Sequence, residues 1–227
     1  MKRTAIAFLV GMFALGLGSA PRADAASVLL DYVGFDYESP NPNPLEFGEL
    51  GSGYVSVGEV PVLAAPLIFD QVNNEYTYVM SGLTAINRQI VGPFIIVDYS
   101  PGNFSAYEDS KNLGTPFDYG VNPPNPTAPT TFNDGTLYVS GDITNFRFVF
   151  NTTDNSGSFE GAFTVTGGSQ LVNIPVTDRM GWTFAGATSN ALNIPAGYAH
   201  QIDGQIIIEP AVPADNTSWG RLKANYR

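Results

Sequence analysis

Few side chains in this sequence have the type and spacing needed for acid–base or nucleophilic chemistry. The chain has one histidine, His200, and Asp203 follows it three residues later. A Ser-His-Asp arrangement can be drawn with this pair, but the Gly-x-Ser-x-Gly motif of one large hydrolase class is missing. Zinc sites need several histidine or cysteine ligands, and the sequence has no cysteine. We therefore expect His200 to be structural, and we predict no catalytic residue, metal or cofactor.

Carboxylates are plentiful, with 21 Asp and Glu residues. Paired carboxylic acids hydrolyse glycosidic bonds, so their number leaves an extracellular glycoside hydrolase or a related carboxylate-dependent hydrolase open. Their spacing does not single out a pair. The segment from Asp154 to Glu160 partly resembles a calcium loop but lacks its twelve-residue register. A hairpin turn explains the same residues, and we prefer that reading to Ca²⁺ binding near Asp154.

Aromatic side chains offer a different chemistry, the stacking of rings on sugars. Residues 100–131 are rich in proline and form a long predicted loop. Tyr107, Phe117 and Tyr119 lie in this loop, and Trp182 lies further along the chain. These four residues are the predicted ligand platform of a carbohydrate-binding module. The alternative is a surface loop whose aromatic rings pack on the edge of the domain.

The elements that must position these side chains are short strands. Apolar residues alternate with polar ones over most of the chain, and Gly, Pro, Asn and Asp separate the alternating runs. The clearest unit, residues 136–166, predicts a three-stranded antiparallel meander with a turn at residues 153–157. Its phenylalanine-rich face needs an opposing layer. We therefore predict an all-β fold, an antiparallel, jelly-roll-like β-sandwich over residues 26–209.

The N-terminus predicts export. Lys2 and Arg3 precede an apolar run from Ala5 to Gly18, and Ala23-Asp24-Ala25 supplies a small-x-small cleavage pattern. Residues 1–25 are therefore a predicted signal peptide, and the protein is expected outside the cytoplasm: extracellular, at the cell surface or in the periplasm. No later segment reaches the roughly 20 apolar residues of a membrane span, so we expect no membrane insertion.

The charge distribution argues against nucleic-acid partners. The stretch from Ala26 to Gly220 contains four basic and 20 acidic residues, which gives 4 − 20 = −16. Such a surface repels phosphate backbones. The remaining basic residues lie at the two ends of the chain.

Residues 210–227 form a compositionally distinct C-terminal tail. Trp219, Leu222 and Tyr226 follow one another at helical spacing, with Arg221 and Lys223 beside them. This pattern predicts a short amphipathic helix or tail that needs a docking partner, because ten residues are marginal for an isolated helix. Trp219, Arg221, Lys223 and Tyr226 are the residues expected to be recognised. Either envelope sorting machinery binds them, or the tail docks on the acidic body of its own chain.

Several turn-and-strand motifs suggest a family. They are Tyr119–Gly141, Gly157-Ser-Phe-Glu-Gly161, Gly181-Trp-Thr-Phe184 and Ile194–Gly204. Together they resemble uncharacterised exported β-proteins that often carry a PEP-CTERM sorting tail, although this chain lacks the Val-Pro-Glu-Pro motif and the membrane helix of that tail. The resemblance implies an extracellular or envelope setting. We thus expect a non-catalytic cell-surface or extracellular matrix protein, with polysaccharide or sorting machinery as partners. The alternatives are a carbohydrate-binding module and a hydrolase.

Overall fold

The computed structural model describes residues 27–39, 46–113, 132–190 and 194–208, all within the compact unit Ala26–Ala211. The described part of the chain is built from β-strands, with two short 3₁₀ turns and no α-helix. The all-β prediction is confirmed. The elements in chain order are β1 (Ser27–Ser39), β2 (Gly53–Leu63), β3 (Asn74–Val91), β4 (Phe94–Tyr99), β5 (Gly102–Ser110), β6 (Thr136–Asn151), β7 (Ser156–Gly167), η2 (Ser169–Asn173), η3 (Val176–Asp178), β8 (Trp182–Ser189) and β9 (His200–Ile208).

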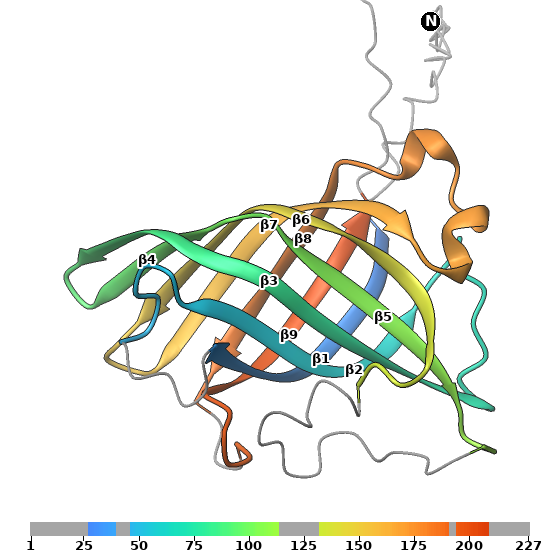
Figure 1. The fold of residues 1–227 in the computed structure, drawn as a ribbon, viewed down its shortest axis with the longest axis horizontal. Coiled ribbons are helices and arrows are strands. Elements are labelled where there is room, and N and C mark those ends of the chain that lie inside the picture. Colours follow the sequence, from blue (N-terminus) through green and yellow to red (C-terminus); the bar gives the residue numbers. More distant parts are fainter. Residues whose placement is uncertain (1–26, 40–45, 114–131, 191–193, 209–227) are drawn as a thin grey trace, which may run out of the picture. The chain divides into compact units, whose positions relative to one another are not determined.

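The strands form one closed sheet, in which every pairing is antiparallel. Apart from β4 and β5, strands that are neighbours in the chain are neighbours in the sheet, and β9 returns to pair with β1, from Ser27 opposite Ile208 to Asp36 opposite His200. The labelled strands can be followed around this ring in Figure 1. The predicted sandwich is therefore wrong: the fold is a closed barrel. Alternating apolar residues require only that one face be buried, and a sheet closed on itself buries that face as two packed sheets do.

Strands β4 and β5 together occupy one of the eight positions in the ring. Both pair with β3 on one side and with β6 on the other. Along β3, the residues of β4 and then of β5 follow in order, from Phe94 opposite Val91 to Ser110 opposite Asn74. The two strands are thus one long strand, interrupted at Ser100 and Pro101.

The predicted three-stranded meander is a two-stranded hairpin. Residues expected to form its first two strands make up the single strand β6, which bends at a bulge near Asn145. The predicted turn before β7 is confirmed. Asp154 holds the turn, because its carboxylate accepts hydrogen bonds from the Ser156 amide (3.2 Å), the Ser156 hydroxyl (2.7 Å) and the Asn151 side chain (3.2 Å). These contacts account for the oxygen-rich sequence at Asp154 as turn chemistry.

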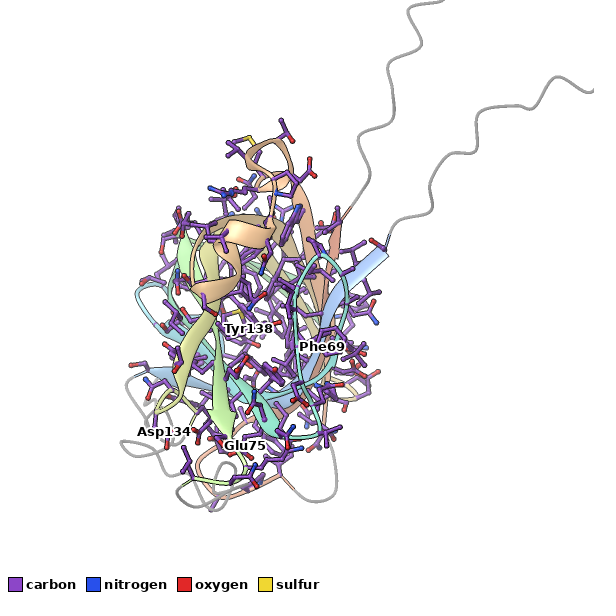
Figure 2. All side chains as sticks on the ribbon, turned by 90° about the vertical axis from the view of Figure 1, so that its right-hand side faces the viewer. Phe69, Glu75, Asp134 and Tyr138 are labelled. Atoms are coloured by element: carbon purple, nitrogen blue, oxygen red, sulfur yellow. The ribbon has the colours of Figure 1, made fainter. Side chains whose placement is uncertain are left out.

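Aromatic rings fill the inside of the barrel. Figure 2 looks onto one end of the ring and shows side chains crowded inside it. Tyr32 lies in the space above Gly204, and Phe159 lies above Gly186, so any side chain at either glycine would collide with a ring. Rings also pack on one another: the centroids of Tyr78 and Phe104 are 5.3 Å apart, at an interplanar angle of 13°. The core is thus a packed aromatic interior.

Several predictions concern residues outside the described part of the chain. These are the signal peptide at residues 1–25, the C-terminal tail at residues 210–227 and its amphipathic helix. Among the described residues, no helix is long and apolar enough to cross a membrane.

Candidate functional site

Of the four residues of the predicted aromatic platform, the structure describes Tyr107 and Trp182, and it contradicts the prediction for Trp182. Trp182 is 2% exposed and packs inside the barrel, with its ring centroid 5.9 Å from that of Phe163. Tyr107 belongs to β5 and takes part in its ladders. Phe117 and Tyr119 lie outside the described residues. Trp182 therefore cannot stack on a ligand at the surface, because its alternating position in β8 points it into the core.

The predicted loop at residues 100–131 is also wrong in its first part. Residues 102–110 form β5, in which Phe104 and Ala106 are buried as in any half-buried strand. The prolines flank this strand rather than interrupt it. Residues 114–131 lie outside the described part of the chain.

The most distinctive feature of the barrel wall is a gap in the hydrogen-bonded ladder between β4/β5 and β6. The β4–β6 register ends at Asp98 opposite Arg147, and the β5–β6 register resumes at Gly102 opposite Ile143. Residues 99–101 and 144–146 are left out of both registers. The β6–β7 ladder also shifts between Thr144 and Arg147. Asn145 and Phe146 are therefore outside the registers on both sides of β6, whereas Thr144 still pairs with Ala162 of β7.

Asn145 marks the centre of the gap. Its φ is +55°, in the left-handed region, where asparagine is tolerated better than other side chains except glycine. Such conformations occur where surrounding structure enforces them, and they cluster at functional sites. Here the left-handed residue forms the bulge that separates β6 from its neighbour.

A pocket of about 650 Å³ lies at this gap. Its volume is within the range of small-molecule sites, about 300–1,000 Å³. We call it the wall pocket and define it by its lining residues, which are Ile86, Asp98, Tyr99, Pro101, Thr144, Asn145, Phe146, Arg147 and Glu160.

Charged side chains form a row along one side of the wall pocket. Asp98, Arg147 and Glu160 lie opposite one another on β4, β6 and β7, and Asn87 of β3 extends the row. The Arg147 Nε donates to Asp98 at 2.6 Å, and the Asn87 amide donates to the other oxygen of Asp98 at 2.8 Å. These two hydrogen bonds, from Arg147 first, lower the pKa of Asp98. Asp98 is therefore held as a carboxylate.

Two aromatic residues of the pocket also belong to the barrel interior. Tyr99 is 3% exposed, and its ring centroid lies 5.5 Å from that of Phe146. The Tyr99 hydroxyl is buried without a hydrogen-bond partner among the described residues. Burial raises the pKa of Tyr99 well above its usual value, with smaller contributions from the negative charges of Glu38 and Asp36. The hydroxyl therefore stays neutral, and it lies in the barrel interior without accessible surface in the pocket.

The one histidine is found in a second arrangement, which the sequence did not predict. His200 Nδ1 lies 3.0 Å from Asp36 Oδ1, and the same oxygen accepts the His200 backbone amide at 2.8 Å. Both residues are buried, at 8% and 1% exposure. Asp203, the partner that sequence spacing suggested, is exposed on β9, whereas His200 is buried. No sequence signal links residues 164 positions apart, so only the β1–β9 pairing reveals the pair.

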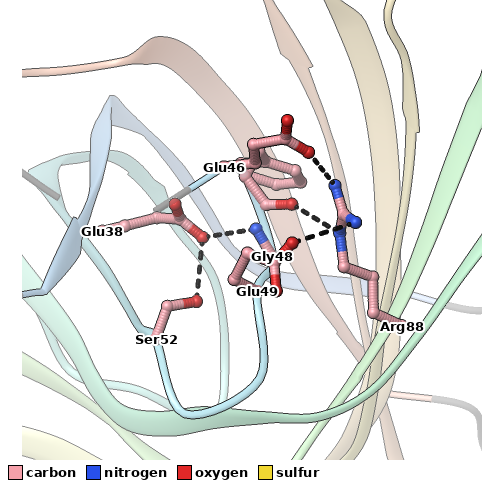
Figure 3. Close-up of polar contacts among 7 residues, drawn as sticks. Glu38, Glu46, Gly48, Glu49, Ser52 and Arg88 are labelled. Carbon is pink, nitrogen blue, oxygen red and sulfur yellow. Dashed lines mark hydrogen bonds and ion pairs between the residues drawn. The ribbon is translucent and has the colours of Figure 1, made fainter. Parts of the chain in front are cut away.

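A folded-in loop covers this histidine. Phe47 lies in the β1–β2 connection, and its ring centroid is 5.8 Å from that of His200. Figure 3 shows how the loop is held: Arg88 pairs with Glu46 and Glu49, each at 3.2 Å, and Glu38 accepts the Gly48 amide and the Ser52 hydroxyl. Phe47 therefore packs over a buried imidazole–carboxylate pair, and the structural role of His200 stays a prediction.

Among the described residues, no group of three or more His, Cys, Asp or Glu could hold a metal ion. Comparison of the chain with protein-family models, with curated proteins and with solved structures finds no match. The resemblance to exported proteins with PEP-CTERM tails therefore stays a prediction.

Proposed function

We propose that the protein is an exported, non-catalytic binding protein that takes a small polar ligand into the wall pocket. The observation that supports this proposal is the interrupted ladder at residues 99–101 and 144–146, where a pocket of about 650 Å³ is lined by charged and apolar residues. A rigid sheet that positions a few polar groups beside apolar surface is typical of a ligand site.

A carboxylate-dependent hydrolase is the alternative with a specific feature in its favour. Asp98 and Glu160 both line the wall pocket. Glycoside hydrolysis, however, needs one carboxyl group that stays protonated near neutral pH. Asp98 has a lowered pKa, and both of its oxygens already accept hydrogen bonds. Arg147 also lies between the two acids in the row. The arrangement therefore favours binding over acid catalysis.

The setting of this activity follows from the N-terminal sequence. We propose that the protein acts at the cell surface or in the extracellular matrix, after removal of residues 1–25. The sequence suggested a carbohydrate-binding module with Tyr107, Phe117, Tyr119 and Trp182 as its platform; we propose the wall pocket in place of that platform.

The proposal is tested by nuclear magnetic resonance on the isotopically labelled full chain. The probes are neutral saccharides, dicarboxylates, polyamines and free amino acids, added class by class. At least one class should shift the amide signals of residues 144–147 in a saturable way, and the probe should be recovered chemically unchanged. Turnover of a probe would show an enzyme instead.

A blocking variant provides the control. Thr144→Phe places a ring in the wall pocket and should abolish the saturable shifts, whereas Thr136→Phe, at the exposed start of β6, should leave them intact. Saturable binding that survives Thr144→Phe would place the ligand elsewhere.

A further inference from the structure

The polar lining of the wall pocket has an order that restricts its ligand. Asp98, Arg147 and Glu160 follow one another on three successive strands, so an acceptor, a donor and an acceptor lie side by side. Neighbouring strands are about 4.8 Å apart, which sets the spacing of the row. A small molecule that lies along this row therefore meets both hydrogen-bond donors and hydrogen-bond acceptors.

Charged ligands match this row poorly. A dicarboxylate would face Asp98 and Glu160, and a polyamine would face Arg147, so each would place like charges together. Arg147 uses its Nε for Asp98, and its side chain is 51% exposed, which leaves the rest of its guanidinium available. Glu160 is exposed on β7. A neutral group that both donates and accepts fits the row, and a hydroxyl does both at a single atom.

The floor of the wall pocket agrees with this assignment. Tyr99 and Phe146 line it, and both side chains belong to the buried aromatic interior. Ile86 adds apolar surface at the rim, where it is 60% exposed. Sugar rings carry both kinds of surface, because C–H groups and hydroxyls alternate around them.

We propose that the ligand of the wall pocket is a neutral, hydroxyl-rich molecule of the saccharide class. This inference rests on the proposed function, since it names the ligand of the same pocket. Arg147 donates to ligand oxygens, Glu160 accepts from ligand hydroxyls, and Asp98 holds Arg147 in position.

The test is a titration of the full chain with a panel of neutral mono- and disaccharides, followed by amide shifts at residues 98–101 and 144–147. Succinate and spermidine serve as the anionic and cationic probes. Saccharides should shift these amides, and the charged probes should not. Glu160→Ala and Arg147→Gln should each weaken saccharide binding about tenfold, because each removes a charge-assisted hydrogen bond. Glu59→Ala, at an exposed glutamate of β2 outside the wall pocket, should leave it unchanged.

The outcomes separate the two proposals. If succinate or spermidine shifts the wall-pocket amides and no saccharide does, the saccharide class is wrong and the binding function stands. If no probe shifts them, both proposals fail. Equal weakening by Glu59→Ala and Glu160→Ala would show a general charge effect and overturn the role of the row.

Discussion

Two interior tyrosines differ in whether the hydroxyl has a partner. The Tyr78 hydroxyl lies 2.8 Å from that of Ser56, inside the barrel. The Tyr32 hydroxyl is equally buried and has no hydrogen-bond partner among the described residues. Its desolvation is therefore uncompensated, which costs free energy in the folded state.

We predict opposite results for removing these two hydroxyls. Tyr78→Phe leaves Ser56 buried without its partner and should lower the free energy of unfolding by about 1–2 kcal/mol. Tyr32→Phe removes an unpaired polar atom and should leave that free energy unchanged or raise it. Urea unfolding followed by circular dichroism measures both. A larger loss for Tyr32→Phe would mean that an ordered water satisfies its hydroxyl.

Asp31 carries an unfavourable charge. Desolvation raises its pKa, and the nearby Asp203 adds to the effect. A carboxyl group whose pKa is higher in the folded protein than in the unfolded chain lowers stability when ionised. This cost is fully present above the raised pKa, and it disappears as the pH falls below the ordinary value of 3.8.

Asp31→Asn should therefore stabilise the protein at pH 7, and the gain should shrink as the pH falls toward 3.8. Urea midpoints of the variant and the unchanged protein at several pH values measure the difference. Asp142→Asn is the matched control for net charge, since Asp142 is an exposed aspartate on β6. An equal gain in both variants would assign the effect to the overall acidity of the protein.

At the scale of elements, the bulge in β6 depends on one residue. Asn145 adopts a left-handed conformation that costs most side chains about 1 kcal/mol or more. Asn145→Ala should therefore lower the free energy of unfolding by about 1 kcal/mol, while Asn145→Gly should be close to neutral. Thermal or urea unfolding compares the two variants. Equal effects would show that the asparagine side chain, and not its backbone, stabilises the bulge.

The sequence predicts elements better than it predicts their interruptions. Alternation located β6 and β7, and the residues from Asp154 to Gly157 correctly placed the turn between them. The same alternation suggested two strands where β6 is one, because a bulge shifts the inward face by one residue and looks like a strand end. The wall pocket depends on that bulge and on the break at Pro101. In the sequence, a change in alternation and a proline are equally consistent with a loop and with a gap in the barrel wall. Sequence reasoning therefore missed the site.

At the scale of the molecule, closure depends on pairing between the first and last described strands. Tyr32 and Ile202 are buried because they occupy the apolar positions of alternating strands, and the same alternation would bury them in a sandwich. Periodicity reports which face is buried and carries no information on whether β1 meets β9, some 170 residues later. The fold class was therefore predictable, and the closed architecture was not.

Closure should make the barrel unfold as one cooperative unit. Amides of the β1–β9 seam, such as those near Val33 and Asp203, should exchange with the same free energy as those of the β6–β7 hairpin. Asn145 and Phe146 should exchange faster, because they lie outside the registers on both sides of β6. Hydrogen exchange under native conditions measures this. A seam that opens at much lower free energy than β6–β7 would contradict a cooperative ring.

The β1–β9 seam also has a use in protein engineering. Ser27 is paired with Ile208, so the two ends of the described barrel are neighbours in space. A short linker between them would allow circular permutation, with new termini cut in the exposed turn at Asp154 and Asn155. Such a permuted chain would keep every strand pairing. Its new ends would lie in the β6–β7 turn instead of the β1–β9 seam, and a reporter or an immobilisation tag could be attached there.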